Sequence, residues 1–541
     1  MDFEQIHIPL EIPVPQENGS NVHIDSRLLT FAAQQAFERL SFTFTREHLE
    51  HLISVALDPV NSPNDRSTAA QLLENANIAA KGMYPLCQDT GTAQVFAWKE
   101  NGIDTGASDD VEALSKGALG AYENRNLRFS TTIPDSLFCE HDPHTNGPAQ
   151  ILVQCTPKTG EDIAYRFLFC AKGGGSANKT GLIQATKALL NEEAFTAYLR
   201  REIAALGTAA CPPYTIAVVV GGISPEQNLL TLKLATAGLY SHTIEGHDYR
   251  VMGALPLRCP EWEQRVLDIA ADTGLGAQFG GRALAVSAIV LRLPRHGASC
   301  PVSLGVSCSA HRNLYGYINS RGFWLEKTID TPERLPGFAD AVSRSAAEAA
   351  QTIEINLDKG IEAARNQLSG MTCGTALVLS GNILVARDAA HARWRQLLNE
   401  GKALPDYLRE YAILYAGPAR TPIGAVTGSF GPTTAGRMDE YADDLMSRGA
   451  ALITIAKGNR NAQWQKACKK YGAFYLGTVG GAAALIAERH VLHSEVIDYP
   501  ELGMEAVRLL KISRLPACMI TNDKGEDFYT SILENNLQQN S

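Results

Sequence analysis

The chain has 541 residues and a formal net charge of −10, with 45% hydrophobic and 20% charged residues. At about 150 residues per domain, this length predicts three to four domains or two large ones, and the composition excludes extended disorder. The acidic balance argues against a dedicated nucleic-acid binder, which presents a basic face. No apolar run reaches the ~18 residues of a membrane span.

The cysteines and the first residues indicate a compartment. Met1–Gln5 predicts neither a secretory signal nor a transit peptide. Eleven cysteines are too sparse for a disulfide scaffold and odd in number, which is typical of free thiols in a reducing environment. We therefore expect a cytoplasmic protein.

Periodicity predicts mixed helices and strands in the N-terminal half. Helices are expected within 26–56 and 67–81, and strands at 93–98, 149–154, 164–170, 216–220 and 285–293. The strands 149–154 and 164–170 are expected as a pair around a polar turn. A helix over 225–239 follows the strand 216–220 and its two glycines, which makes a strand–turn–helix unit.

The C-terminal half has a different sequence pattern. The stretch 331–367 is charged, Ala-rich and helical in period, and is expected to join two domains. Beyond it, short strands are expected at 376–379, 383–386, 451–456, 473–476 and 517–521, with a helix at 388–399. Such alternation predicts an α/β unit with a partly parallel sheet.

Three cysteines lie in turns of glycine, proline and small residues. They are Cys87 in Pro85–Thr92, Cys211 in Gly207–Pro213 and Cys308 in Gly305–Ser309. Backbone of this type can approach a metal centre, but the wide spacing is unlike the paired Cys-x-x-Cys of a zinc site. From spacing alone, buried structural thiols remain the commoner alternative.

A glycine run and several cations are further candidates. Gly173–Thr180 resembles a phosphate loop, with Asn178 where such a loop needs glycine, and the alternative is a tight strand-to-helix turn.

Arg387 and Lys457 each follow a predicted strand, where open α/β sheets bind ligands. Single surface cations are usually salt-bridge partners; gathered in an acidic chain, they indicate an anionic small molecule.

Read in order, these stretches closely resemble the class I fumarases, the iron–sulfur-dependent fumarate hydratases. The resemblance runs from about Leu57 to Asp527 and is densest in seven blocks: Leu86–Thr92, Ala171–Thr180, Gly207–Tyr214, Leu293–Ser309, Gly431–Met438, Ile455–Arg460 and Tyr499–Ala506. Several blocks in one order are far more specific than any single motif.

The resemblance implies a [4Fe-4S] cluster held by only three thiolates, those of Cys87, Cys211 and Cys308. One iron is then left open as a Lewis acid, whereas an electron-transfer cluster uses four ligands. Cys300, eight residues before Cys308, is the expected non-ligand.

The implied reaction is the reversible hydration of fumarate to (S)-malate, a tricarboxylic acid cycle step. The family's substrate-binding residues match Gln88, Asp89, Arg128, Gly175, Arg387, Thr433, Arg437 and Lys457. Thr433 resembles the family's proposed base, supported by Asp89, and His296 is expected as a proton donor or orienting residue. Arginine forks suit the carboxylates of the substrate.

The family fold implies two α/β domains in a homodimer, with the site where the domains meet. We expect an iron–sulfur cluster-binding domain over 1–335, a linker region over 336–370, and a smaller swivelling β/β/α-type domain over 371–541. Two departures from the family pattern are His311, where aspartate is expected, and Ala482, where proline is usual.

Three rival functions remain open at this point. A related hydro-lyase acting on tartrate or mesaconate differs from fumarase by small substrate groups, although tartrate dehydratases usually divide the two domains between separate chains. A nucleotide-binding protein would use Gly173–Thr180. An iron–sulfur redox or sensing protein would need four ligands and leaves the C-terminal cations without a purpose.

Overall fold

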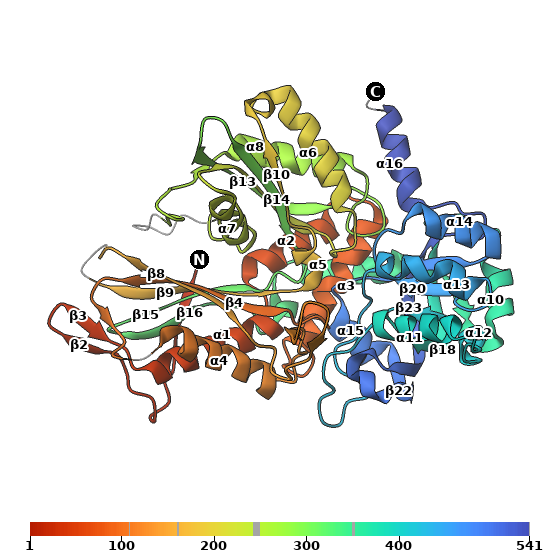
Figure 1. Cartoon of the computed structure of the whole chain (residues 1–541), viewed down its shortest axis with the longest axis horizontal. Coiled ribbons are helices and arrows are strands. Elements are labelled where there is room, and N and C mark those ends of the chain that lie inside the picture. The colour runs from red at the N-terminus through yellow and green to blue at the C-terminus, as the bar shows by residue number, and fades with distance from the viewer. Residues whose placement is uncertain (108, 159–161, 242–248, 349–351, 540–541) are drawn as a thin grey trace.

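The structure is a computed structural model that describes residues 1–107, 109–158, 162–241, 249–348 and 352–539. These residues form three large sheets of six, five and seven strands, and two small ones. The first two sheets belong to the N-terminal half, red to green in Figure 1, and the third to the teal and blue C-terminal half. This confirms the predicted two-domain α/β class.

The first sheet is mixed, and helices α1 (Ser26–Phe42) and α4 (Asp110–Asn124) cover one of its faces. Its strands lie in the order β1 (Phe3–Ile6), β16 (Gly322–Glu326), β15 (Asn313–Asn319), β9 (Ala164–Lys172), β4 (Thr92–Glu100) and β8 (Gln150–Thr156). The prediction that 149–154 pairs with 164–170 is wrong, because β4 lies between β8 and β9. The reason is burial: β9 is apolar and buried, so it takes a central place, whereas the half-exposed β8 stands at the edge.

The second sheet lies above the first in Figure 1. Its strands lie in the order β10 (Gly181–Ala185), β14 (Cys300–Ser307), β11 (Tyr214–Gly222), β13 (Ala285–Arg295) and β12 (Leu257–Arg258). Helix α7 (Pro225–Thr236) fills the space between the two sheets, since Leu234 packs toward the first and Leu232 toward the second. Helices α6 (Glu192–Leu206) and α8 (Pro260–Asp272) lie on its other face.

Three more helices connect the halves. The helical stretch predicted within 26–56 breaks at Thr43 and Thr45, two β-branched residues in extended backbone, into α1 and α2 (Arg46–Leu57). Helix α3 (Pro63–Ala79) starts with a capping box of Ser62 and Asp65. Helix α9 (Phe338–Glu348) packs on α3.

The C-terminal sheet is parallel from β17 to β21 and antiparallel at β22 and β23, as the predicted partly parallel sheet requires. Its strands lie in the order β17 (Ile353–Asn356), β18 (Ala376–Val385), β19 (Ile413–Leu414), β20 (Ile453–Ala456), β21 (Phe474–Gly477), β23 (Val507–Thr521) and β22 (Val491–Asp498). The two strands expected at 376–379 and 383–386 are one strand, β18, with an irregularity at Gly381. The expectation of helix throughout 331–367 is likewise wrong at β17, which is an edge strand of this sheet.

The helices of the C-terminal half pack around this sheet. They are α10 (Ile361–Leu368), α11 (Asp388–Asn399), α12 (Tyr407–Glu410), α13 (Ala442–Met446), α14 (Ala462–Tyr471), α15 (Ala483–Arg489) and α16 (Phe528–Gln539). The remaining short elements are β2 (Gln16–Asn18), β3 (Asn21–His23), β5 (Ile103–Asp104), β6 (Ile133–Pro134), β7 (Glu140–His141) and α5 (Gly174–Ala177).

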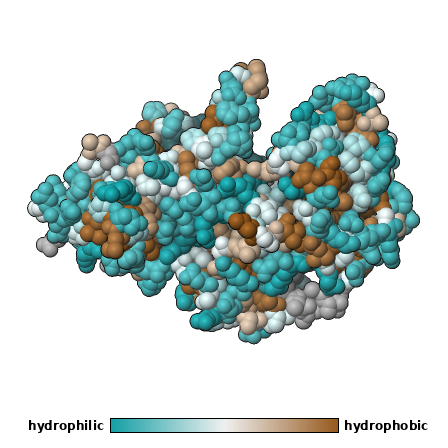
Figure 2. Space-filling model, turned by 90° about the horizontal axis from the view of Figure 1, so that it is seen from below, coloured by the Kyte–Doolittle hydropathy of each residue, from teal (hydrophilic) through white to brown (hydrophobic). Residues whose placement is uncertain are grey.

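One hydrophobic core runs from the second sheet through α3 into the C-terminal sheet, so the two halves pack tightly. Seen from below, hydrophobic side chains form separate patches among hydrophilic ones (Figure 2). Within the described ranges, no helix combines the length and apolar character that crossing a membrane requires.

Candidate active site between the two halves

Three thiols approach one another from three loops of the N-terminal half. Cys87 lies between α3 and β4, Cys211 between α6 and β11, and Cys308 directly after β14. Cys87 and Cys211 are buried and Cys308 is partly exposed. Burial raises the pKa of the Cys211 thiol to about 11, and the charges of Cys308 and Cys87 act in the same direction, against that of Lys457. The three thiols are therefore neighbours in space, although they are far apart in sequence.

The backbone packs closely around the sulfur of Cys211, so that only glycine fits at position 480. Cys211 itself has a positive φ of 61°, and a Cβ added at Gly480 would lie 2.3 Å from its Sγ. Within the described residues, no group of three or more His, Cys, Asp or Glu side chains is arranged to hold a single metal ion. Three cysteine thiols that act electrostatically on one another are the soft donors that iron–sulfur clusters use, so the donor set fits such a cluster.

Cys300 and His296 lie at the other end of β14. Cys300 is the first residue of that strand and is fully buried, and His296 is exposed in the turn that precedes it. Since β14 has eight residues at ~3.3 Å each, about 25 Å separates this end from Cys308. Within one chain, the structure does not bring His296 to the other predicted site residues.

Asp89 and Arg128 form a largely buried ion pair beside Cys87. Arg128 Nη2 lies 2.9 Å from Asp89 Oδ1, and the Gly174 backbone N–H donates to Asp89 Oδ2 at 2.8 Å. Burial alone would raise the pKa of Asp89, but the charges of Arg128 and Arg312 and the bond from Gly174 lower it below its ordinary 3.8. The carboxylate thus joins the glycine run to Arg128.

The glycine run itself forms only the single turn α5. Gly175 lies against the loop of Cys211, since a Cβ there would be 3.4 Å from the Ala210 Cα. The tight approach in this run is at Gly173, where a Cβ would lie 2.9 Å from Asp89 Oδ2, so glycine is required there by packing.

The loop 431–437 reaches the site from the C-terminal half. Gln88 Nε2 donates to the Pro432 carbonyl at 3.2 Å, so this loop contacts the residue next to Cys87. Arg437 Nη1 lies 3.5 Å from Thr433 Oγ1, and Arg437 Nη2 is 2.8 Å from Asp388 Oδ2. Thr433 and Arg437 are therefore adjacent, and the arginine is oriented by its carboxylate partner.

Arg387 is buried where β18 meets α11, and its Nη2 bonds Glu505 at 2.7 Å. Its Nε is buried without a hydrogen-bond partner. Burial lowers the pKa of Arg387, and the positive charges of Arg128 and Arg437 lower it further. Three arginines from both halves thus lie close together, and a bound anion would reduce the repulsion between their positive charges.

Lys457, directly after β20, joins these cations to the thiols. Its Nζ donates to Cys211 Sγ at 2.8 Å. Burial would lower the pKa of Lys457, but the charges of Cys211, Cys87 and Cys308 raise it above its ordinary value. Two residues on, Asn459 Oδ1 accepts from the Thr208 N–H at 3.0 Å, a direct contact between the halves.

A cleft of about 460 Å³ opens beside these residues. Both halves line it, including Gly175, Lys179 and Ala209 from one side and Thr434, Arg437 and Asn459 from the other. A small dicarboxylate can enter between the halves at this point.

Several residues of this region were missed by sequence reasoning. Ser176 accepts a bond from the Cys308 N–H at 3.2 Å, and Glu505 orients Arg387. Lys172, which precedes the glycine run, and Arg312, which follows Cys308, are both buried. Their positions inside the resembling blocks, or next to them, were the only signal that could have singled them out.

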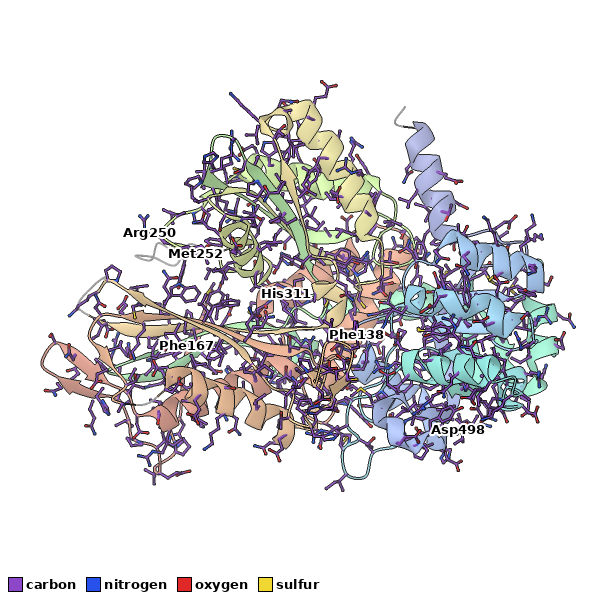
Figure 3. The ribbon with its side chains drawn as sticks, viewed as in Figure 1. Phe138, Phe167, Arg250, Met252, His311 and Asp498 are labelled. Carbon is purple, nitrogen blue, oxygen red and sulfur yellow. The ribbon has the colours of Figure 1, made fainter. Side chains whose placement is uncertain are left out.

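His311 lies on the connection between the first two sheets, near the middle of the molecule (Figure 3). Its Nδ1 lies 2.8 Å from Ser307 Oγ and its Nε2 3.0 Å from Asn313 Nδ2, and its ring stacks on that of His48. Burial, with the charge of His48, lowers its pKa well below the ordinary value. This departure from the family pattern is therefore a neutral imidazole behind the Cys308 loop.

Comparisons with known proteins agree with this arrangement. Residues 30–316 match the family model described as fumarate hydratase, and residues 325–532 match the one described as fumarase C-terminus. The class I anaerobic fumarate hydratase of Escherichia coli K12 is 45% identical over 511 residues, which cover 94% of this chain and 91% of that one. The chain belongs to the class I fumarate hydratase family.

Two further relatives are similar to this class I family member over different lengths of chain. Fumarate hydratase 2 of Leishmania major is 44% identical over 512 residues, 94% of this chain and 88% of that one. A putative L(+)-tartrate dehydratase subunit beta of Methanocaldococcus jannaschii is 30% identical over 172 residues, 31% of this chain but 88% of the subunit. A single subunit of that relative thus corresponds to about a third of this fused chain.

Proposed function

We propose that this class I family member catalyses the reversible hydration of fumarate to (S)-malate, with a [4Fe-4S] cluster held by Cys87, Cys211 and Cys308. The observation that carries the proposal is the 2.8 Å contact between Lys457 and Cys211, which joins the thiols of one half to the cations of the other. When bound, the cluster supplies an open Lewis-acidic iron for a carboxylate and the departing hydroxyl.

The arginines bind the two carboxylates of the substrate. Arg128, Arg387 and Arg437 already have carboxylate partners that orient them, and the free Nε of Arg387 is a ready donor. Bidentate contacts of this kind stabilise the charge that builds on a carboxylate when the neighbouring carbon loses a proton.

Thr433 Oγ1 holds the proton removed from that carbon. The positive charge of Arg437 beside it favours loss of the hydroxyl proton. Asp89 supports this chemistry by orienting Arg128 and the glycine run, while Gln88 fixes the loop that carries Thr433. Closure of the two halves excludes water and strengthens each contact.

We also propose that the active form is a cytoplasmic homodimer in which His296 acts across the interface. His296 is exposed in the turn before β14, about 25 Å from the Cys308 end of that strand, so a second copy is needed to bring its imidazole to a site. Co-expression of a His296→Ala chain with an Arg387→Met chain should restore part of the activity that each homodimer lacks. No restoration in a hybrid dimer, or a monomeric mass, would refute this part.

The main test is anaerobic reconstitution, with iron, sulfide and fumarate loss measured on one sample. We expect about four irons per chain and fast hydration. Cys308→Ala should lose both, whereas Cys300→Ala, the matched control at the other end of β14, should keep both. Iron uptake with activity only on tartrate or mesaconate would refute the substrate, and a chain that binds no iron would refute the mechanism.

A further inference from the structure

The cations around the thiols divide into two groups by their partners. Arg128, Arg387 and Arg437 each have a carboxylate oxygen within 2.9 Å. Lys457, Lys172 and Arg312 have no carboxylate at ion-pair distance in the described part of the chain. Asp89 lies near enough to Arg312 and Lys457 for their charges to lower its pKa, but it is already paired with Arg128. Buried charge needs a counter-charge, so the second group requires a further anion.

Lys172 lies behind the Cys308 loop. It is the last residue of β9 and is 6% exposed. Its Nζ donates to the Thr236 carbonyl and to Ser307 Oγ, both at 3.0 Å, and Ser307 immediately precedes Cys308. Burial lowers its pKa to about 8, while the charge of Cys308 opposes that shift. An ammonium ion held only by neutral oxygens is destabilising unless an anion lies nearby.

Arg312 belongs to the same loop, four residues after Cys308. It is 3% exposed, and its Nε is buried without a hydrogen-bond partner. A Cβ added at Gly173 would lie 2.9 Å from Asp89 Oδ2 and 3.5 Å from Arg312 Nη2, so the guanidinium lies near the site. Burial raises the pKa of Cys87, and Arg312 is the strongest charge that opposes this effect.

We infer that Lys172 and Arg312 are positioning residues for the cluster, whose thiolates at Cys87 and Cys308 are the counter-charge of these two buried cations. The inference rests on the proposed function. It makes retention of the cluster and its reduction potential depend on two side chains that touch neither iron nor substrate. Residues of this kind commonly change metal affinity about 10–100-fold.

The test compares Lys172→Met and Arg312→Gln with wild type after anaerobic reconstitution. The readouts are the rate of iron loss to a chelator and the midpoint potential of the cluster. We expect iron loss about tenfold faster in each variant and a more negative potential, since removing positive charge disfavours the reduced cluster. Lys116→Met, at an exposed position of α4, is the control and should change neither readout.

Thermal unfolding of the iron-free proteins separates this role from a structural one. Iron-free Lys172→Met should unfold at or above the wild-type temperature, because an uncompensated buried charge is gone. Unfolding more than about 5 °C lower, or a potential and iron-loss rate equal to those of wild type, would overturn the inference. Wild type that takes up no iron would instead refute the proposed function.

Discussion

The two halves of the molecule bring different chemistry to their interface. The N-terminal half brings the three thiols, on loops that follow α3, α6 and β14, together with cations such as Arg128. The C-terminal half brings cations alone, on loops beyond β18 and β20. The thiols are held by burial and close backbone packing, whereas Arg387 and Arg437 are held by carboxylate partners. Because different residues carry the two tasks, we expect variants of the C-terminal half to lose substrate binding without losing iron.

The largest expected effect on activity is that of Arg387→Met. Removing a buried guanidinium should lower kcat/KM about 10²–10³-fold, because charge that develops on the substrate loses its donor. The iron content of Arg387→Met should stay at the wild-type value. The control is Arg393→Met, at an exposed position of α11, which should keep both the iron content and the kcat/KM of wild type. Iron lost in parallel with activity would show that the halves do not divide their tasks.

A smaller effect is expected at the direct contact between the halves. In Asn459→Ala the Thr208 N–H loses its acceptor, which costs about 1 kcal/mol. Substrate binding that needs both halves should weaken about fivefold, read as a higher KM in steady-state kinetics. Asn459→Asp keeps an acceptor oxygen and should lose less; equal losses in the two variants would contradict a hydrogen-bonded contact.

The smallest effect concerns Asp89 and folding. Its native pKa lies below the ordinary 3.8, because the charges of Arg128 and Arg312 outweigh burial. Ionised Asp89 therefore stabilises the fold above about pH 4, and this contribution is lost as the pH falls through the lower native pKa. At pH 7 wild type should unfold about 4 °C above Asp89→Asn, with the gap closing below pH 4. A gap independent of pH would refute this origin.

Local patterns explain which parts of the fold could be predicted. Sequence patterns located β4 and β11, whose nearly continuous apolar runs are typical of strands buried on both faces, and the helices α7 and α11. It did not separate α1 from α2, and it did not place β4 between β8 and β9, because pairing partners depend on burial that arises only when the sheet assembles.

The sequence by itself determined the family, the three cysteines in permissive turns and the cations beyond strand ends. Only the tertiary structure decided which of these residues meet. Cys300 and Cys308 are eight positions apart, yet a strand of about 25 Å separates them, whereas Lys457 and Cys211, far apart in the chain, lie in contact. The physical reason is that an extended strand carries neighbours apart, while packing of the two halves brings distant loops together.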